Sequence, residues 1–500
     1  MQRRHLIFTA VTTMLVLVSA GIGIGCTSGS GNGSGSKGSG SNLGGGAGGG
    51  AGGGESAAVL SPADAAKLAR TGGDASVRNS GVNAFGQPVS GLTKDELRAF
   101  VVGNNFFNDN WVTAPASTTG RDGLGPLFNA QACSSCHFKD GRGSPPTEDN
   151  PTAKGLLIRL SIPGEDLATG APAPDPTYGG QFQDKAITGV PPEGRLDISY
   201  EEIAGKLSDG TEYSLAKPTY TLSDPAYGPF HPEVMTSPRV GNAIFGTGLL
   251  EAIPESAVRG FADPNDSDGD GISGRVNEVW SPEHKKTMLG RFGWKANVAS
   301  VKEQVAGAFH GDIGMTSSLH PDQDCMPVQT ECLAAPNGGE PELDDKKLDR
   351  VDFYTRTLAV PARRDVTKAA VWRGESTFKA LNCSGCHKTN IKTGATSPRQ
   401  LSKQTISPYT DLLLHDMGAG LADGRPDFLA GGTEWRTAPL WGIGLTKTVN
   451  GHTRFLHDGR ARNVTEAILW HGGEAESAKK AFVGLNSRDR NDLLAFLNSL

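Results

Sequence analysis

The sequence predicts a mainly α-helical fold made of two similarly built domains, and three observations support that prediction. A five-residue motif, Cys-x-x-Cys-His, occurs at residues 133–137 and again at residues 383–387, about 250 residues apart. The chain has 500 residues, enough for two or three domains with cores of their own. Leucines recur at helical spacing in residues 489–500, and a helix is also expected over residues 348–358, so each half is expected to end in a helix.

The motif has the spacing of a haem c attachment site. In haem c the two cysteines form thioethers with the vinyl groups and the following histidine binds the iron. A redox-active dithiol needs no such histidine, and a zinc site would require the four cysteines to converge. The sequence therefore predicts two covalently attached haem c groups, each in a cytochrome c-like domain. The predicted attachment and iron-binding residues are Cys133, Cys136, His137, Cys383, Cys386 and His387.

The N-terminal segment has the layout of a secretory signal. Arg3 and Arg4 precede an apolar stretch over residues 6–20, and Gly-Ile-Gly before Cys26 resembles a lipobox. We expect residues 1–25 to be removed and Cys26 to be lipidated; cleavage after Ala20, which would leave a free thiol, is the alternative.

Residues 26–82 are predicted to be a flexible tether, because residues 27–54 are almost wholly Gly, Ser, Asn and Ala. A lipoprotein on the periplasmic face of a bacterial membrane, more often the outer membrane, is the expected location, and a soluble periplasmic protein is the alternative. Only the lipid anchor would contact the membrane, since no later apolar run is long enough to cross a bilayer. A net charge of −6 argues against a nucleic-acid partner.

The two haem domains are expected at residues 83–360 and 361–500. Within the first, residues 145–240 are rich in Pro, Gly and Thr and contain short alternating stretches at 156–162 and 212–222. This composition favours strands and loops over helices, so it predicts a β- and loop-rich insertion.

Two further features have structural interpretations. Cys325 and Cys332 lie close together in a loop without a nearby motif histidine, so in an oxidising compartment we expect a disulfide between them.

The loop 263–278 contains alternating carboxylates, and these resemble the start of an EF-hand. A structural calcium ion held by Asp266, Asp268 and Asp270 is one interpretation, and an Asp/Gly-rich turn is the other. The glutamate usual at the twelfth loop position is replaced by Asn277.

Longer segments resemble the di-haem oxidoreductase family, whose members are also described as thiol oxidoreductase-like. The likeness extends over about residues 85–500, and a more distant one relates the chain to bacterial di-haem cytochrome c peroxidases and the methylamine-utilisation di-haem enzyme. The segments that carry it are residues 123–129, 290–296, 353–358, 414–418, 434–437, 455–460 and 468–474.

In those distant relatives the N-terminal haem performs peroxide chemistry and the C-terminal haem supplies electrons. A tryptophan lies between the haems, followed ten residues later by a distal glutamine and ten further by a catalytic glutamate. The resemblance implies these roles for Trp294 and Gln304, with a buried structural aromatic as the alternative for Trp294. The glutamate position is Gly314 in this chain, so Asp312 is the nearest carboxylate that could substitute.

The resemblance also implies the ligands of the two irons. His471 lies fourteen residues after His457, where the peroxidases carry a methionine, so His387 and His471 would both bind the C-terminal iron. Met417 is the rival sixth ligand. No histidine or methionine closely follows His137, so an open position is expected on the N-terminal iron.

The expected function is that of a peroxidase-like oxidoreductase. It would reduce peroxide, or bind dioxygen, with electrons from a small cytochrome c or a cupredoxin. The alternatives are a substrate-oxidising enzyme of the methylamine-utilisation type and an electron carrier without catalysis. A carrier would have two six-coordinate haems, whereas both enzymes need one accessible iron.

Overall fold

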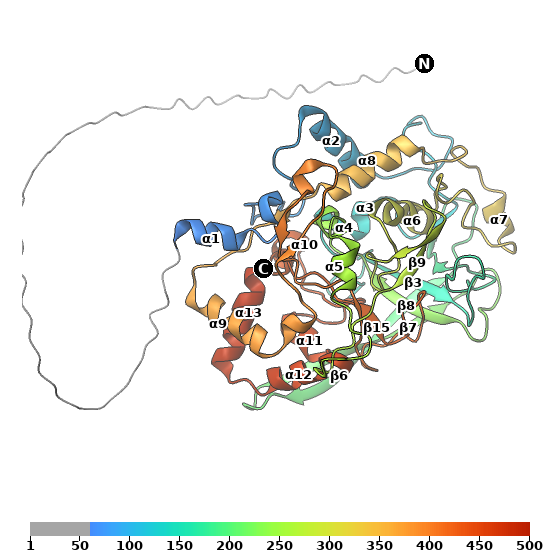
Figure 1. Ribbon diagram of the computed structural model, residues 1–500. Helices are drawn as coiled ribbons and strands as arrows, with labels where there is room; N and C mark the ends of the chain where they lie inside the picture. Colours follow the sequence, from blue (N-terminus) through green and yellow to red (C-terminus); the bar gives the residue numbers. More distant parts are fainter. Residues whose placement is uncertain (1–60) are drawn as a thin grey trace, which may run out of the picture. The chain divides into compact units, whose positions relative to one another are not determined.

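The computed structural model describes residues 61–500 (Figure 1). Helices make up 29% of these residues and strands 19%, so the expected mainly α fold is only partly confirmed. The difference comes from many short strand pairs and from the Pro-, Gly- and Thr-rich segment after the first motif, which forms strands instead of helices. The predicted signal segment and Cys26 lie outside the described residues.

The first elements of the described residues fall within the stretch predicted as tether. Helix α1 (Pro62–Ala69) begins at Ser61, whose hydroxyl accepts a hydrogen bond from the Asp64 amide. A 3-10 turn, η1 (Gly73–Ala75), leads into β1 (Ser76–Val77), which pairs in parallel with β11 (Val360–Pro361). The predicted tether therefore extends too far toward the C-terminus, because its Gly/Ser-rich composition ends near residue 54.

Two helices cross beside the first motif. Helix α2 (Lys94–Asn108) starts with a capping box formed by Thr93 and Glu96, and it packs on α8 (Asp345–Arg356). Gly103 lies at the crossing, where a Cβ atom would collide with the Arg350 carbonyl oxygen. The first motif forms α3 (Cys133–Cys136), and its contacts with α2 hold it against this pair.

A matching pair stands beside the second motif. Helix α9 (Ala369–Ala380) packs on α13 (Ser487–Ser499), and Gly374 takes the place of Gly103 at the crossing, against the Asp492 carbonyl oxygen. The motif itself is the 3-10 turn η3 (Cys383–Gly385). In both halves the first helix thus carries Gly-x-x-x-Phe, with the phenylalanine (Phe107 or Phe378) one turn nearer the motif.

The segment 145–240 is built from strands, and no helix lies within it. Strand β3 (Leu156–Ser161) lies between β4 (Gln181–Phe182) and β8 (Met235–Val240), antiparallel to both. Strands β6 (Arg195–Lys206) and β7 (Glu212–Ser223) form a long hairpin that reaches the C-terminal helices (Figure 1). Most of β6 is exposed, so its alternating pattern reflects one face lying on the protein.

The remaining elements are short. In the first half they are η2 (Phe138–Asp140), β2 (Leu127–Phe128) with β5 (Lys185–Ala186), α4 (Thr247–Glu251), α5 (Glu255–Arg259), β9 (Glu278–Ser281) with β10 (Lys286–Leu289), α6 (Val301–Ile313) and α7 (Thr330–Leu333). In the second they are β12 (Ile391–Lys392) with β13 (Thr405–Ile406), η4 (Arg399–Leu401), β14 (Leu414–Asp416) with β15 (Glu434–Arg436), η5 (Ile443–Leu445), α10 (Thr446–Asn450), α11 (Val464–Leu469), η6 (Gly473–Ala475) and α12 (Glu476–Val483).

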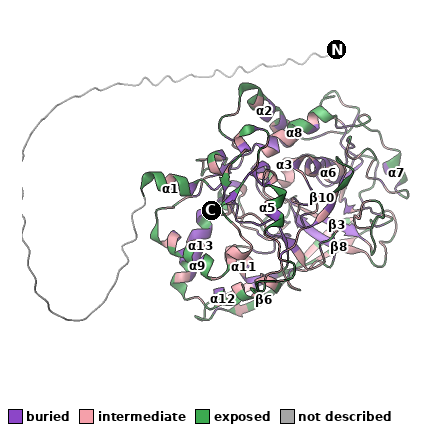
Figure 2. Cartoon of the chain, viewed as in Figure 1, coloured by how far each residue is buried: buried purple, intermediate pink, exposed green. Residues whose placement is uncertain are grey.

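Buried residues occur along most of the described chain (Figure 2), and they form apolar clusters that combine residues of both halves. The larger apolar cluster joins Phe85 and Phe245, whose rings stack at 4.3 Å, to Trp441 of the second half. The second cluster centres on α9, α11 and α13 and includes Trp294 from the first half. Trp294 therefore belongs to the surroundings of the second motif. Among the described residues, no helix is long and apolar enough to span a membrane.

Candidate functional site

Each Cys-x-x-Cys-His motif is folded as a single tight turn. The backbone amide of His137 donates to the Cys133 carbonyl oxygen at 2.9 Å, and that of His387 donates to Cys383 at 3.0 Å. One turn of this kind brings the two sulfur atoms and the imidazole to the same side of the backbone. The predicted attachment residues are thus grouped in space at both motifs.

Both motif histidines are oriented in the same way by a backbone carbonyl. The Nδ1 atom of His137 lies 2.6 Å from the Asn242 oxygen, and that of His387 lies 2.7 Å from the Tyr409 oxygen. A carbonyl only accepts, so Nδ1 carries the proton and Nε2 keeps a free lone pair, as in metal-binding histidines. Burial lowers the pKa of both rings, that of His387 to about 4. Each imidazole is therefore neutral at pH 7 and able to bind iron.

A cavity of about 240 Å³ opens beside the second motif. Its wall is largely apolar and comes from α9, α11 and α13 and from the loops between them. The reactive side chains that face it are Cys383, Cys386, His387, His415, Met417 and His471. A flat, mostly apolar prosthetic group with two cysteine attachment points suits this set of residues.

His471 repeats the geometry of the motif histidines. It follows α11, and its Nδ1 atom lies 2.7 Å from the Ala467 carbonyl oxygen, which again leaves Nε2 free. A charge on His471 would lower the pKa of His387, so the two rings lie near one another at the cavity. Met417 also lines this cavity, and its side chain makes only apolar contacts with the second cluster.

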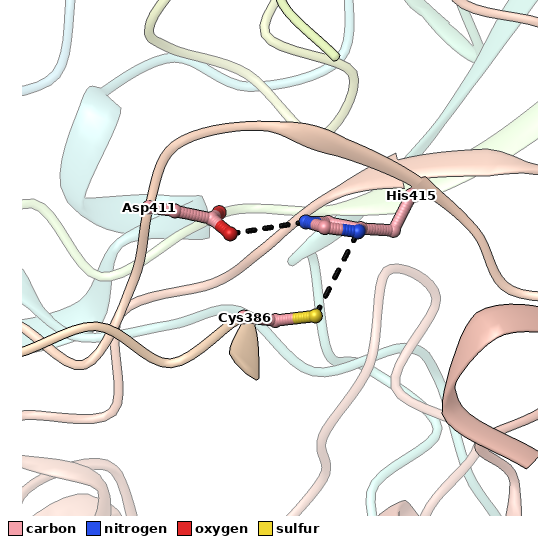
Figure 3. Close-up of side chains that lie close together, drawn as sticks. All are labelled: Cys386, Asp411 and His415. Carbon is pink, nitrogen blue, oxygen red and sulfur yellow. Dashed lines mark hydrogen bonds and ion pairs between the residues drawn. The ribbon is translucent and has the colours of Figure 1, made fainter. Parts of the chain in front are cut away.

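A charged group lies behind the second motif (Figure 3). The imidazole of His415 is held between Asp411, 3.1 Å from Nε2, and Glu474, 2.7 Å from Nδ1, with Cys386 Sγ 3.7 Å from Nδ1. Burial favours the neutral ring, but the hydrogen bonds outweigh it and raise the pKa of His415 to about 12. The two carboxylates therefore favour the imidazolium form of His415, and both of its nitrogens are engaged by them.

The carboxyl group of Asp312 lies near the first motif. Burial raises the pKa of Cys133 and of Cys136, the Asp312 charge adds to both shifts, and that charge also acts on His137. Gln181 donates from Nε2 to Asp312 Oδ1 at 2.9 Å, and burial raises the pKa of Asp312.

Gln304 lies on the same helix, α6, as Asp312. The two are eight residues apart, which places both side chains on one face about 12 Å apart along the axis. The Gln304 Oε1 atom is buried without a hydrogen-bond partner among the described residues. No hydrogen bond joins Gln304 to Asp312 or to the first motif within residues 61–500.

Trp294 lies in the wall of the cavity of the second motif. Its Nε1 donates to the Val240 carbonyl oxygen at 2.8 Å. The next residue, Gly241, lies against the His137 ring, since a Cβ atom there would be 2.9 Å from His137 Cε1. Trp294 is thus connected through two residues of backbone to the histidine of the first motif, and it also faces the second.

The disulfide and the acidic loop lie outside the two motifs. Cys325 and Cys332 are buried and bonded to one another, with their Cα atoms 5.8 Å apart.

The carboxylates of the acidic loop, Asp266, Asp268 and Asp270, have oxygens within 4.8 Å of each other. Asn277, at the twelfth position, donates its amide to the Lys295 and Asp427 carbonyl oxygens. Its side chain therefore does not face the three carboxylates.

Sequence reasoning missed two groups that the structure brings to the motifs. Gln181 comes from β4 in the insertion, and nothing in its sequence context distinguishes it from an ordinary strand residue. His415 lies within residues 414–418, which we used only for the family likeness. Its neighbours Asp411 and Glu474 are remote from each other in sequence, so no local spacing could have indicated a shared proton.

Two oriented imidazoles, each beside a cysteine pair and one of them facing a deep apolar cavity, define a protein with two haem-binding sites. The chain belongs to the family described as "Di-haem oxidoreductase, putative peroxidase", whose sequence profile matches residues 66–500. The predicted family membership is therefore confirmed, and with it haem as the cofactor and oxidoreductase chemistry as the family's class of activity. No curated protein and no solved structure gave a match.

Proposed function

We propose that the protein is an exported, peroxidase-like oxidoreductase in which two c-type haems have different tasks. The observation that carries the proposal is an asymmetry between the motifs. The second motif has another imidazole, His471, prepared in the same way as His387 and facing the same cavity. The first motif has instead a partly buried carboxyl group with an amide partner, Asp312 and Gln181. Two imidazoles suit electron relay, and a carboxyl group suits proton transfer.

At the second motif, Cys383 and Cys386 would hold the haem and His387 and His471 would bind its iron. A bis-His haem supplies one-electron transfer at low potential. The Tyr409 and Ala467 carbonyl oxygens fix the two rings, so neither histidine needs to reorient when the charge changes. Met417 remains the competing sixth ligand, but no comparable group orients its side chain.

At the first motif, Cys133 and Cys136 would hold a haem bound by His137 and open on its other side. Such a haem supplies reductive cleavage of peroxide, in which two electrons and two protons convert hydrogen peroxide to two waters. Asp312 is the residue that would move protons: burial raises the pKa of its carboxyl group, and Gln181 donates to Oδ1 so that Oδ2 remains available. Gln304, on the same helix face, would hydrogen-bond the substrate.

Trp294 is the proposed connection between the two centres. Its ring faces the second cavity, and its Nε1 is bound to the strand end that adjoins His137. A buried aromatic in this position shortens the through-space distance for electron transfer. The donor would be a small cytochrome c or a cupredoxin in the periplasm, reached by a protein anchored through a lipid on Cys26.

The acidic loop is proposed to hold a structural calcium ion on Asp266, Asp268 and Asp270. The loop continues into Ile272, which lines the cavity, and Ser273, whose hydroxyl and amide both donate to Glu474. An ion there would stabilise the wall of the second site without contacting either haem.

Low-temperature electron paramagnetic resonance of the oxidised holoprotein tests the proposal. We expect a high-spin ferric signal from the first haem, which peroxide changes, beside a low-spin signal from the second. Two low-spin signals that ignore peroxide, in both the oxidised and the half-reduced protein, would instead establish an electron carrier. If reduced donor alone does not sustain peroxide consumption, and an organic or protein substrate is also required, the substrate-oxidising alternative is established.

A further inference from the structure

The end of the cavity nearest Trp294 contains buried nitrogen atoms without partners. Arg142 Nε and His457 Nε2 make no hydrogen bond within the described residues, and both side chains line the cavity. The His457 side chain is only 3% exposed. A buried polar atom left unpaired costs about 1–3 kcal/mol, and more when it is charged. These atoms are therefore expected to meet a polar partner inside the cavity.

Arg142 is held in place from three sides. Its Nη2 donates to the Leu456 carbonyl oxygen at 2.6 Å, and its guanidinium lies over the rings of Trp294 and Phe455 at 5.5 and 5.6 Å. Arg142 is bonded to Leu456, which directly precedes His457. The side chains that carry the two unpaired nitrogens, Arg142 and His457, are therefore neighbours. The remaining donors of Arg142 are fixed in direction by the planar guanidinium.

Arg436 is bonded to the backbone at Trp294. Its backbone amide donates to the Trp294 carbonyl oxygen, and its Nε and Nη1 donate to the Gly293 and Thr437 carbonyl oxygens at 2.8 and 3.1 Å. Arg436 is buried and lines the same cavity. Two arginines thus line the same cavity as Trp294.

Neither arginine has a carboxylate in direct contact among the described residues, although Asp458 acts on Arg142 and Asp411 acts on Arg436 from a distance. Within residues 61–500, no carboxylate forms an ion pair with Arg142 or Arg436. Other buried arginines do have such partners: Arg239 lies 2.9 Å from Asp427, and Arg460 lies 2.8 Å from Asp458. Burying an unpaired charge is costly, so the two charges at Trp294 require anions that the ligand brings.

We propose that Arg142, Arg436 and His457 form a site for two carboxylates, namely the propionate groups of the haem attached to Cys383 and Cys386. The inference rests on the proposed function, since it requires haem c at the second motif. In haem c the two propionates lie on one edge of the ring, and the points of attachment to cysteine lie elsewhere on it. A single cavity lined by both a cysteine pair and two arginines matches that arrangement. Guanidinium groups bind carboxylates through paired hydrogen bonds.

The site has a structural consequence. Arg142 lies five residues after His137 in the first motif, yet it would bind the haem of the second. One short segment would thereby position both cofactors relative to each other. A carboxylate-bearing substrate is the other possible source of the anion, and the measurements below separate it from the propionate.

The first experiment compares the holoproteins of Arg142→Gln, Arg436→Gln and, as the matched control, Arg454→Gln. Arg454 carries the same charge and lies in the loop that contains His457, but it does not line the cavity. Reduction adds negative charge, so at a fixed ambient potential we expect the reduced-to-oxidised ratio of the second haem to fall about tenfold in the first two variants. The control should stay within about twofold, because a solvated charge is screened.

The second measurement identifies the carboxylate. Haem labelled with ¹³C in its propionate carboxyls gives infrared bands that we expect to shift in Arg142→Gln, and less in Arg142→Lys, but not in Arg454→Gln. Unmoved labelled bands, or equal reduced fractions in all the variants, would overturn the site even if haem is attached. Absence of haem mass on the 383–386 peptide of the wild-type protein would overturn the proposed function together with the site.

Discussion

The two motif regions share a scaffold and differ in what faces the cofactor. In the first, the ring of Phe107 lies 5.4 Å from Tyr354 and 6.2 Å from His137. In the second, Phe378 lies 5.2 Å from Phe496 and 6.1 Å from His387. Each phenylalanine follows the crossing glycine by four residues, and each partner ring follows the contacted residue of the other helix by four.

What differs is the ionisable group nearest each motif. Asp312, partly buried and bonded to Gln181, lies near the first motif, whereas His471 and the imidazolium of His415 lie near the second. A duplicated helix pair thus fixes where the two cofactors lie, and a few polar residues outside it determine their chemistry. The predictions below test that separation, beginning with the largest expected effect.

The largest effect is expected from Asp312→Asn at the first motif. Removing a positioned proton-transfer group lowers a rate by about 10²–10⁴-fold, so peroxide turnover should fall by that amount. Stopped-flow oxidation of the half-reduced holoprotein measures it. Asp324→Asn is the control, because Asp324 accepts from Gln183 and has no bond to Gln181. Equal losses in both variants would remove Asp312 from the proton path.

His471→Gly should change the iron ligation at the second motif, whereas Asp312→Asn affects proton transfer at the first. Loss of the sixth ligand converts a low-spin iron to a high-spin one, and added imidazole should restore the low-spin resonance. Met417→Leu should leave that resonance unchanged. If Met417→Leu abolishes the low-spin signal while His471→Gly preserves it, the methionine is the ligand and the proposed relay site must be redrawn.

The sequence predicts the shared scaffold better than the differences. Both motifs, the strands of segment 145–240 and the family could be deduced from residues close together in the chain. Gly-x-x-x-Phe before each motif was also available as a signal and was overlooked. The groups that distinguish the sites come from distant segments: Gln181 reaches Asp312 across 131 positions, and His415 reaches Glu474 across 59. Such pairs form only through tertiary packing, so no repeating pattern in the local sequence can indicate them.

The helix crossings provide a smaller and symmetric test. In Gly103→Ala and Gly374→Ala the new Cβ meets a backbone carbonyl, so each pair must separate, at a cost of about 1–3 kcal/mol of stability. Urea unfolding of the holoproteins measures the loss. If the scaffold is duplicated and independent, Gly103→Ala should perturb only the resonance of the first haem and Gly374→Ala only that of the second. Gly120→Ala, at a position where a Cβ atom would meet no atom within 4 Å, serves as the control.

Calcium removal should give the smallest effect, and it should be confined to the second region. The acidic loop adjoins the second motif only: Ile272 would collide with a Cβ atom on Gly385, and Ser273 is bonded to Glu474. An ion present at ten times its dissociation constant stabilises the folded state by about 1.4 kcal/mol. A chelator should therefore lower the urea midpoint slightly and shift the resonance of the second haem, and Asp268→Asn should abolish the response. A shift at the first haem would mean that the two regions are coupled through this loop, and an identical response in Asp268→Asn would place the ion elsewhere.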